Sequence, residues 1–301
     1  MNQETMQGVL CMQKPAEFTS FDVIGKLRGI LHMRRLGHTG TLDPMATGVL
    51  PVLVGKAARA CDILPDQSKI YRATVQFGWE TDTEDVWGTR TAVYPEMHVT
   101  KEALDAVLPQ FVGAIQQVPP MYSAVSVEGT RLYELARRGV VIERPARTVQ
   151  VDSIVLEAWD EDKQTAELSV ACGKGTYIRT LLEDIAAAMG QKGTMSALRR
   201  TTAGVYTEAD AHTLEEILAA KEQGPAALEA LMLPVESVFT PLPLLVVEPW
   251  VEQHLYNGCP TSRYPAADGR YRVRNAAGQF LGLANITGGV LRVEKLFVER
   301  N

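Results

Sequence analysis

Alternating hydrophobic and polar positions predict the strands of this chain. From Lys69 to Phe77, apolar side chains occupy every second position and mostly polar ones lie between them. Because successive side chains of a strand point to opposite faces, this pattern predicts a half-buried strand. The runs 148–159 and 164–172 flank the acidic turn 160–162 and predict a hairpin. Further strands are expected at 8–12, 122–127 and, apolar on both faces, 49–54.

Helical periodicity is interspersed with these strands. Apolar residues recur three and four positions apart between Val23 and Leu31, and Thr19-x-x-Asp22 before them is a capping box. Thr213 begins another capped helix, and Gly190 ends the helix expected at 176–189. Shorter helices are expected at 55–64, 100–111 and 131–138. This mixture of strands and helices predicts an α+β fold.

The last sixty residues have a different pattern. Thr240-Pro241-Leu242-Pro243 interrupts the preceding helices, and short strands separated by glycine or asparagine turns are expected at 270–275, 279–286 and 290–298. We therefore predict two domains, residues 1–239 and a small β-rich module at 240–301. Within the first, residues 119–147 have prolines near both ends and many basic side chains, which indicates an extension that folds over a ligand.

Composition indicates an ordinary cytosolic protein. The 301 residues are 46% hydrophobic and 22% charged, as in soluble globular proteins. Residues 1–17 show no secretory signal, and no apolar run is long enough to span a membrane. The four cysteines are widely spaced, with no metal-ligand spacing, so we expect reduced thiols, no bound metal and a cytoplasmic location.

The charge of the chain is unevenly distributed. The net charge is −6, which alone argues weakly against a nucleic-acid partner. However, residues 11–40, 131–147, 174–200 and 260–274 together hold 19 of the 30 basic residues and only 7 of the 36 acidic ones. Phosphate contacts are local, so basic stretches on an acidic protein can bind a nucleic-acid backbone. The alternative is that these stretches are solvated surfaces that do not converge.

The segment from Gly37 to Pro51 is the strongest candidate for a functional loop. Its glycines, prolines and threonines cannot propagate a helix, so it is a shaped loop. It carries one acid, Asp43, between Leu42 and Pro44. An isolated Asp-Pro is usually a turn former. The length of this motif favours a single carboxylate that a stiff loop presents to a ligand.

Other motifs are less specific. The Gly-Lys pairs at 55–56 and 173–174 lack the spacing of a nucleotide-triphosphate loop. The acidic run 81–85 could supply the second carboxylate that a glycosidase needs, but we predict that it is a solvated loop. Residues 174–180 combine glycine, a helix N-terminus that attracts anions, and Arg179, which could pair with a carboxylate.

The order of these motifs is more informative than any one of them. Seven segments follow one another: 14–15, 37–51, 69–73, 81–83, 119–124, 174–180 and 197–200. In this arrangement the chain resembles the tRNA pseudouridine-55 synthases of the TruB family, from about residue 8 to residue 235. Gly37 to Pro44 is a highly specific signature of that family. The last sixty residues are a weaker match and look like its small PUA-type module.

The resemblance implies a fold and a reaction. The fold is a pseudouridine synthase core, a mixed and mainly antiparallel sheet with flanking helices, followed by a PUA-like domain. The reaction converts the uridine at position 55, in the T-loop of tRNA, to pseudouridine. The N-glycosidic bond breaks, the uracil turns, and a C–C bond forms to C5, with no metal, nucleotide or redox cofactor. Residues 119–147 would be a thumb-like insertion that closes on the T-arm, and 240–301 would contact the acceptor stem of the tRNA. We expect a monomer.

The resemblance also implies the groups that act directly on the base. Asp43 corresponds to the essential carboxylate, which either attacks the ribose C1′ or removes a 2′ proton, and both routes stay open. Arg179 corresponds to the arginine that keeps this acid ionised and aimed. Tyr71 corresponds to the tyrosine that stacks on the target base and accepts the C5 proton, although on its strand alone it would be an ordinary core tyrosine.

Supporting roles follow in the same way. Tyr177 and Leu198 match positions that line the base pocket. His38 matches the histidine that fills the space left when the uridine leaves the RNA stack. Lys14 and Pro15 are expected to shape the loop beneath the pocket.

Two other classes of protein stay open from the residues themselves. An RNA-binding or tRNA-folding protein would have the same basic stretches and C-terminal module. A nucleoside hydrolase would use the same acid but would release free uracil.

Overall fold

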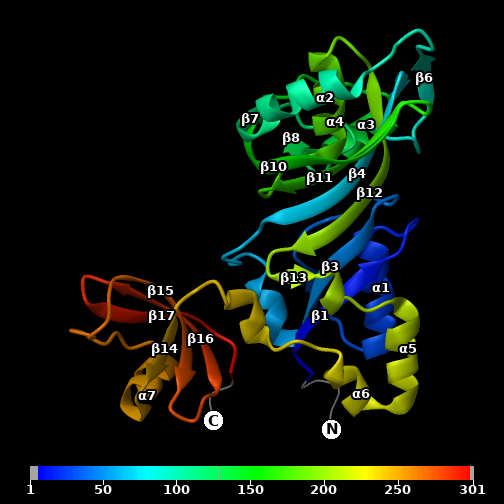
Figure 1. The fold of residues 1–301 in the computed structure, drawn as a ribbon. Helices are drawn as coiled ribbons and strands as arrows, with labels where there is room; N and C mark the ends of the chain where they lie inside the picture. Colours follow the sequence, from blue (N-terminus) through cyan, green and yellow to red (C-terminus); the bar gives the residue numbers. More distant parts are fainter. Residues whose placement is uncertain (1–5, 128, 299–301) are drawn as a thin grey trace.

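The computed structural model describes residues 6–127 and 129–298, and its main feature is a nine-stranded sheet (Figure 1). Seven strands follow the order β1-β3-β12-β4-β11-β10-β7, while β13 pairs with β12 and β2 with β3. All pairs are antiparallel except β3 with β12. The prediction of a mixed, mainly antiparallel sheet is confirmed. The strands are β1 Gly8–Lys14, β2 Leu36–His38, β3 Thr47–Val54, β4 Lys69–Phe77, β7 Gly113–Gln117, β10 Arg147–Asp160, β11 Thr165–Cys172, β12 Gly193–Ala203 and β13 Tyr206–Thr207.

Strand β4 shows how sequence periodicity places the core. Tyr71, Ala73, Val75 and Phe77 are all buried, as their alternation predicts. On that face they join the apolar side of helix α4 in one core, so the helix covers the sheet. The first turn of α4 therefore packs into the same core as β4.

The helices begin where the capping residues predict. The Thr19 and Thr213 capping boxes are both formed, at α1 and α5. The helix expected at 55–64 is instead a 3₁₀ turn, Gly55–Ala60. None of the helices in the described ranges is long and apolar enough to cross a membrane. The α-helices are α1 Ser20–Leu31, α2 Lys101–Val107, α3 Leu132–Arg137, α4 Ile178–Ala188, α5 Leu214–Gln223, α6 Pro225–Ala230 and α7 Pro249–Asn257, and the other 3₁₀ turns are Leu108–Phe111, Glu208–Asp210 and Val235–Phe239.

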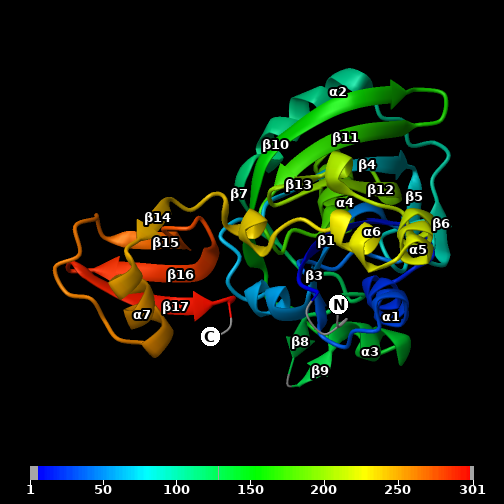
Figure 2. The same cartoon turned by 90° about the horizontal axis from the view of Figure 1, so that it is seen from below.

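Two small hairpins extend from the large sheet. Strands β5 Trp79–Thr81 and β6 Arg90–Val93 pair with each other. Strands β8 Ser126–Val127 and β9 Thr130–Arg131 pair next to α3, within the extension expected at 119–147. Seen from below, β8, β9 and α3 lie on the opposite side of the large sheet from α2 (Figure 2).

The C-terminal segment forms a four-stranded sheet in the order β14-β15-β16-β17. It lies to one side of the large sheet in both views (Figures 1 and 2). The β-rich pattern is confirmed, but the segment also contains α7, which the sequence pattern did not indicate. That helix buries only Val251 and Leu255, too few apolar positions for a clear helical period. Its strands are β14 Leu244–Val247, β15 Gly269–Asn275, β16 Phe280–Thr287 and β17 Val290–Leu296.

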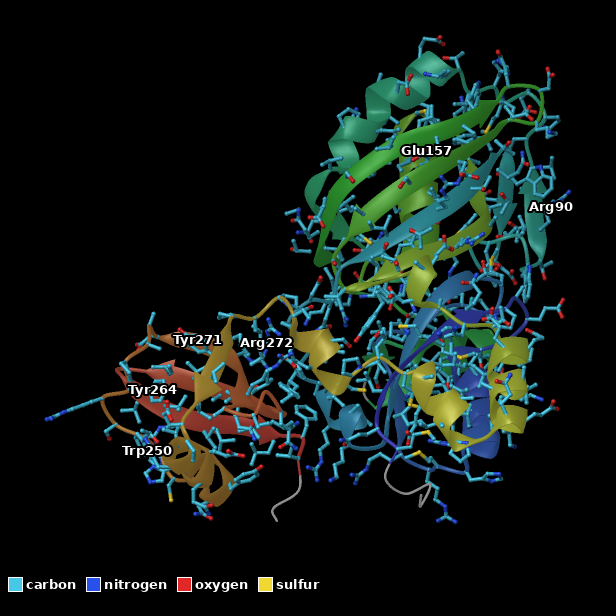
Figure 3. The ribbon with its side chains drawn as sticks, turned by 60° about the horizontal axis from the view of Figure 1, so that its bottom comes forward. Arg90, Glu157, Trp250, Tyr264, Tyr271 and Arg272 are labelled. Atoms are coloured by element: carbon cyan, nitrogen blue, oxygen red, sulfur yellow. The ribbon has the colours of Figure 1, made fainter. Side chains whose placement is uncertain are left out.

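The two sheets are joined by a shared core and by an ion cluster around the buried Glu236. Phe297 of the C-terminal segment belongs to the same core as Val9 of β1 and Phe239 of the connecting turn. Glu236, only 6% exposed, pairs with Arg272 at 2.7 Å and with Arg274 at 2.7 Å. Figure 3 shows Arg272 at this junction. The small sheet is thus held against the large one by polar as well as apolar contacts.

Candidate active site

The loop from Thr39 to Ala46 connects β2 to β3 and is anchored to the core beneath it. Leu42 is 3% exposed, and its N–H donates to the buried Ser20 hydroxyl at 2.9 Å. The Ala46 N–H donates to the Asp43 carbonyl at 3.0 Å, which closes a turn. These contacts fix the backbone on both sides of Asp43, whose side chain remains 33% exposed.

Arg179, in the first turn of α4, binds the Asp43 carboxylate through two of its nitrogens. Its Nε donates to Oδ2 at 2.9 Å and its Nη2 to Oδ1 at 3.2 Å. The arginine is 4% exposed, and its remaining donors reach the carbonyls of Thr83 and Tyr122, each at 2.9 Å. A planar guanidinium bound at both edges cannot rotate, so it orients the carboxylate as well as balancing its charge.

The acidic run 81–85 is not the solvated loop that we predicted. Asp82 is exposed, but Asp85 is only 8% exposed and lies 3.8 Å from Arg179 Nε. Burial raises the pKa of the Asp85 carboxyl, against the opposing effects of the Thr83 hydroxyl and Arg179. The prediction failed because a run of acids looks hydrophilic, whereas the turn directs its last carboxylate inward toward a cation.

Glu84 also differs from the prediction that residues 81–85 form a solvated loop. Its carboxylate accepts a hydrogen bond from Thr180 Oγ1 at 2.6 Å, and its backbone φ is +63°. Burial raises the pKa of Glu84 from 4.5 to about 7, with the neighbouring Glu183 adding to the effect. This acid therefore changes charge near neutral pH, next to the helix that carries Arg179.

Replacing Glu84 with glutamine is expected to make stability less sensitive to pH. The folded protein binds the Glu84 proton more tightly than the unfolded chain, so this contribution is complete below pH 4.5 and is lost as pH rises through about 7. At about 1.4 kcal/mol for each tenfold change in proton affinity, the difference amounts to at most about 3 kcal/mol. The free energy of unfolding in urea should be measured at pH 4.5 and pH 8. Relative to the wild type, Glu84→Gln should be more stable at pH 8 than at pH 4.5. The exposed Glu222→Gln should not, and equal pH profiles for the wild type and Glu84→Gln would contradict the assignment.

Two fully buried cations, Lys14 and Arg200, donate hydrogen bonds to backbone carbonyls of the Asp43 loop or next to it. Lys14 donates to the carbonyls of Pro15, Phe18 and Pro44, and burial lowers its pKa from 10.5 to about 8, despite the opposing charge of Asp43. Lys14 thus links Pro15 to Pro44 of the Asp43 loop. Among the ion pairs of the described residues, none includes Lys14.

Arg200 is the second buried cation, and sequence reasoning gave it no role. Its Nε donates to the Val49 carbonyl at 2.7 Å, and its Nη2 donates to the Gly40 carbonyl at 3.1 Å. It thus connects both ends of the Asp43 loop, and on the sheet it is directly opposite Tyr71. Gly48, opposite Arg200 across β3 and β12, has φ +103°, and a Cβ there would lie 2.1 Å from the Arg200 carbonyl oxygen, so only glycine fits.

Exchanging Arg200 for lysine should reduce turnover by about 100-fold, because a displacement of the reacting group by about 1 Å has that effect. Lysine keeps the charge but has one nitrogen, which cannot span the carbonyls of Gly40 and Val49. The adjacent Arg199 is exposed and pairs with Glu208, so Arg199→Lys is the matched control and should stay near wild type. Steady-state kinetics and thermal unfolding of both variants test this. A kcat equal for the two variants would contradict the role of Arg200.

The loop and Arg179 open onto a cavity of about 760 Å³. Asp43, Tyr71, Tyr177, Arg179 and Leu198 all line it, although they come from distant parts of the chain. Burial raises the pKa of the Tyr71 hydroxyl, and the nearby charge of Arg200 acts in the opposite direction. Tyr177 is fixed through its backbone, whose N–H and carbonyl bond to the side chain of the buried Gln117 at 2.8 and 3.0 Å. Gln117 carried no sequence signal, whereas Asp85 and Arg200 lie in the segments 81–85 and 197–200, which the sequence analysis noted without giving either residue a role at this site.

Of the residues predicted to bind the substrate, His38 alone does not line this cavity. It lies at the end of β2, outside the lining of this cavity, and contacts it through the ring of Phe21, whose centroid is 5.7 Å away. Burial is the main cause that lowers the pKa of His38, and the charge of Arg200 adds to it. The buried Nδ1 of His38 has no hydrogen-bond partner among the residues that the structure describes.

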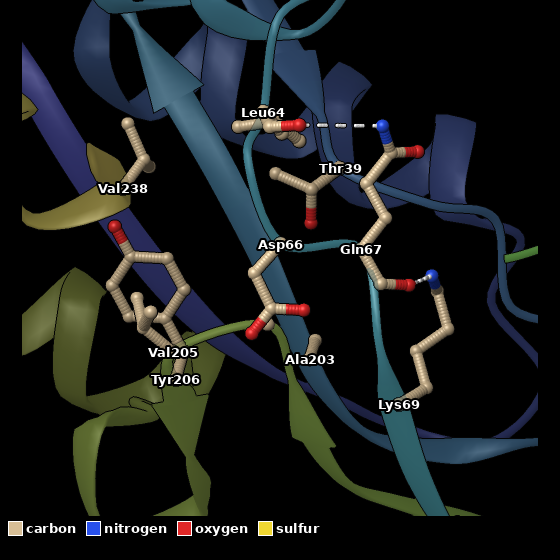
Figure 4. Close-up of a pocket in the computed structure, with 10 residues that line it drawn as sticks. Thr39, Leu64, Asp66, Gln67, Lys69, Ala203, Val205, Tyr206 and Val238 are labelled. Carbon is tan, nitrogen blue, oxygen red and sulfur yellow. Dashed lines mark hydrogen bonds between the residues drawn. The ribbon is translucent and has the colours of Figure 1, made fainter. Parts of the chain in front are cut away.

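A second, much smaller cavity adjoins the first, and Lys69 lines both cavities (Figure 4). Its volume is about 20 Å³, enough for one water molecule but not for a nucleotide. In Figure 4 the Lys69 ammonium group points to the Gln67 carbonyl. Within the described ranges, no three His, Cys, Asp or Glu side chains are grouped as metal ligands. The larger cavity is therefore the candidate active site.

Comparison with protein families gives two adjacent matches. Residues 28–178 match the model of the TruB family pseudouridylate synthase N-terminal domain, and residues 179–240 match the tRNA pseudouridylate synthase B C-terminal domain. Curated proteins named tRNA pseudouridine synthase B are similar over nearly the whole chain. The protein of Synechococcus elongatus is 43% identical over 290 residues, covering 95% of this chain and 96% of the relative. That of a Nostoc strain is 40% identical over 298 residues, covering 97% and 99%.

Solved structures share the fold. A chain from an H/ACA ribonucleoprotein bound to a substrate RNA containing 2′-deoxyuridine superposes with a TM-score of 0.74 at 22% identity, covering 98% of this chain and 86% of the other. A chain of a Cbf5-Nop10-Gar1 complex gives a TM-score of 0.74 at 24% identity, covering 97% and 85%. The predicted pseudouridine synthase fold with a β-rich C-terminal domain is confirmed.

Proposed function

Because the chain belongs to the TruB family of pseudouridylate synthases, we propose that it isomerises uridine in tRNA to pseudouridine, at position 55 of the T-loop, with Asp43 as the catalytic carboxylate. One observation supports this choice of residue above the others. Asp43 is the partly exposed acid at the cavity, and the buried Arg179 holds both of its oxygens.

The reaction requires that one bond to the ribose be replaced by another. The C1′–N1 bond breaks, the uracil turns in the cavity, and a C1′–C5 bond forms, after which the C5 proton leaves and N1 is protonated. Asp43 either attacks C1′, with the uracil leaving as an anion, or removes the 2′ proton. In both routes the carboxylate must be ionised and aimed, which the two-nitrogen contact of Arg179 supports.

The other cavity residues have roles that fit their positions. Tyr71 would stack on the uracil and accept the C5 proton, while Tyr177 and Leu198 would line the base pocket. His38, behind the Phe21 ring, would occupy the space vacated in the RNA stack. Lys14 and Pro15 would hold the loop in shape, since Lys14 bonds to the carbonyls of Pro15 and Pro44.

RNA binding extends this proposal to the rest of the chain. Removing a base from its stack costs a few kcal/mol, which phosphate and stacking contacts must offset. Residues 119–147 would close on the T-arm, because Arg131 and Arg137 of this segment line the cavity. We propose that the chain divides into two domains between residues 239 and 240. The small C-terminal domain would contact the acceptor stem. We further propose a cytoplasmic monomer that requires no metal or other cofactor.

Nucleoside analysis of a T-arm RNA hairpin after incubation with the protein tests the reaction. Pseudouridine should appear with no release of free uracil. Free uracil without pseudouridine would indicate a nucleoside hydrolase, and RNA binding with neither product would indicate an RNA-binding or tRNA-folding protein.

A further inference from the structure

Two large aromatic side chains are exposed at the candidate active site. Among the phenylalanines and tryptophans, all of which lie in the described part of the chain, only Phe21, Trp87 and Trp250 are exposed, at 66%, 53% and 57%. Phe21 and Trp87 both line the 760 Å³ cavity. Leaving such a side chain in water forgoes about 1.5–3 kcal/mol of burial, so finding two of three at one cavity points to a ligand that covers them.

Phe21 is presented by a rigid helix. It occupies the first turn of α1, between the capping-box residues Thr19 and Asp22. Its ring meets the ring of His38 edge to face, at an interplanar angle of 84°. Because the helix and this contact hold the ring in place, stacking on it costs little conformational entropy.

Trp87 belongs to the turn between β5 and β6, and this turn is tied to the catalytic pair. The Trp87 N–H donates to Asp85 Oδ1 at 3.0 Å, and the other oxygen of Asp85 lies 3.8 Å from Arg179 Nε. The backbone of Trp87 is thus anchored to this pair, and its side chain lines the cavity.

Basic side chains line the same cavity. Arg131, Arg137 and Lys174 are among its lining residues, and the Arg137 guanidinium lies 5.6 Å from the centre of the Tyr133 ring. Cations that attract phosphates together with aromatic rings on which bases stack are the combination by which proteins bind unpaired nucleic acid. A protein partner would not require this excess of positive charge.

We propose that Phe21 and Trp87 form an aromatic rim on which the unpaired bases beside the target uridine stack once that uridine has entered the cavity. This inference rests on the proposed function and adds two base-contacting residues to it. The rim holds the opened RNA loop, while Asp43 and Arg179 act on the extracted nucleotide.

Binding of a T-arm hairpin, measured in the Asp43→Asn background, tests the rim without turnover. Phe21→Ala and Trp87→Ala should each weaken the Kd by about 5- to 100-fold, as expected for loss of one base–aromatic stack. Phe21→Trp and Trp87→Phe keep a ring and should bind within about threefold of the background. Trp250→Ala is the matched control, because this exposed tryptophan of α7 lies in the small module (Figure 3) and does not line the cavity. This variant should bind the hairpin as the background does.

Tryptophan fluorescence provides a readout that a purely structural role would not change. RNA binding should quench part of the emission, and this part should be missing in Trp87→Phe although that variant still binds. A fully paired duplex without the loop should not cause this quenching. Unchanged affinity in both alanine variants, or quenching that persists in Trp87→Phe, would overturn the proposal. The binding assay is independent of catalysis, so absence of pseudouridine in the wild type would reject the proposed function and not the rim.

Discussion

Substituting asparagine for Asp43 is expected to lower the rate of pseudouridine formation by about 10⁴-fold or more, while the Kd for tRNA stays within about threefold. Asparagine has nearly the same shape and can still accept a hydrogen bond from Arg179 Nε. It cannot serve as a nucleophile or base, and its amide nitrogen would face Arg179 Nη2 where a carboxylate oxygen now lies. Single-turnover nucleoside analysis and filter binding would measure the two quantities.

The comparison needs a control that removes a charge elsewhere. Asp62 is exposed and follows the 3₁₀ turn Gly55–Ala60, so Asp62→Asn should behave as wild type. If Asp43→Asn still forms pseudouridine at a rate close to that of Asp62→Asn, Asp43 is not the essential carboxylate.

Arg179→Lys should have the second-largest effect, a fall in kcat of about 10³-fold. The guanidinium satisfies both oxygens of Asp43 and the carbonyls of Thr83 and Tyr122. A lysine ammonium keeps the charge, but it cannot make the planar two-point contact, and it leaves buried carbonyls unpaired. The carboxylate would lose its orientation more than its countercharge.

Arg179→Lys should therefore change kcat much more than KM, as single-turnover and steady-state rates over a range of tRNA concentrations would show. Arg199→Lys is the control for the substitution itself. A kcat within tenfold of wild type, with the unfolding temperature unchanged, would mean that charge alone is sufficient and that the two-point contact is dispensable.

Much of the fold could be predicted because its signals are local. The alternation in β4 and the Thr19 and Thr213 capping boxes lie within single elements, and each is found where it was expected. Helix α7 was missed for the same reason, since two buried apolar residues do not make a period. The 3₁₀ turn at Gly55–Ala60 shows that a helical pattern does not determine which helix forms.

The site was predictable only in part, because burial of a charge is not a local property. Arg199 and Arg200 are adjacent and chemically identical, yet one is exposed and the other fully buried. Only the pairing of β12 with β3 and β4 determines which one faces the Asp43 loop. Asp85 was misjudged for the same reason. The meeting of Asp43 with Arg179 was expected from the family resemblance, not from any periodicity.

The buried carboxylate of Glu236 limits how far the two sheets can move relative to each other. Swinging the small sheet away would separate the buried Glu236 carboxylate from Arg272 and Arg274 and leave its charge without these partners. The proposed RNA contacts at the cavity and at the small domain would therefore be held at a spacing that the protein does not readily change.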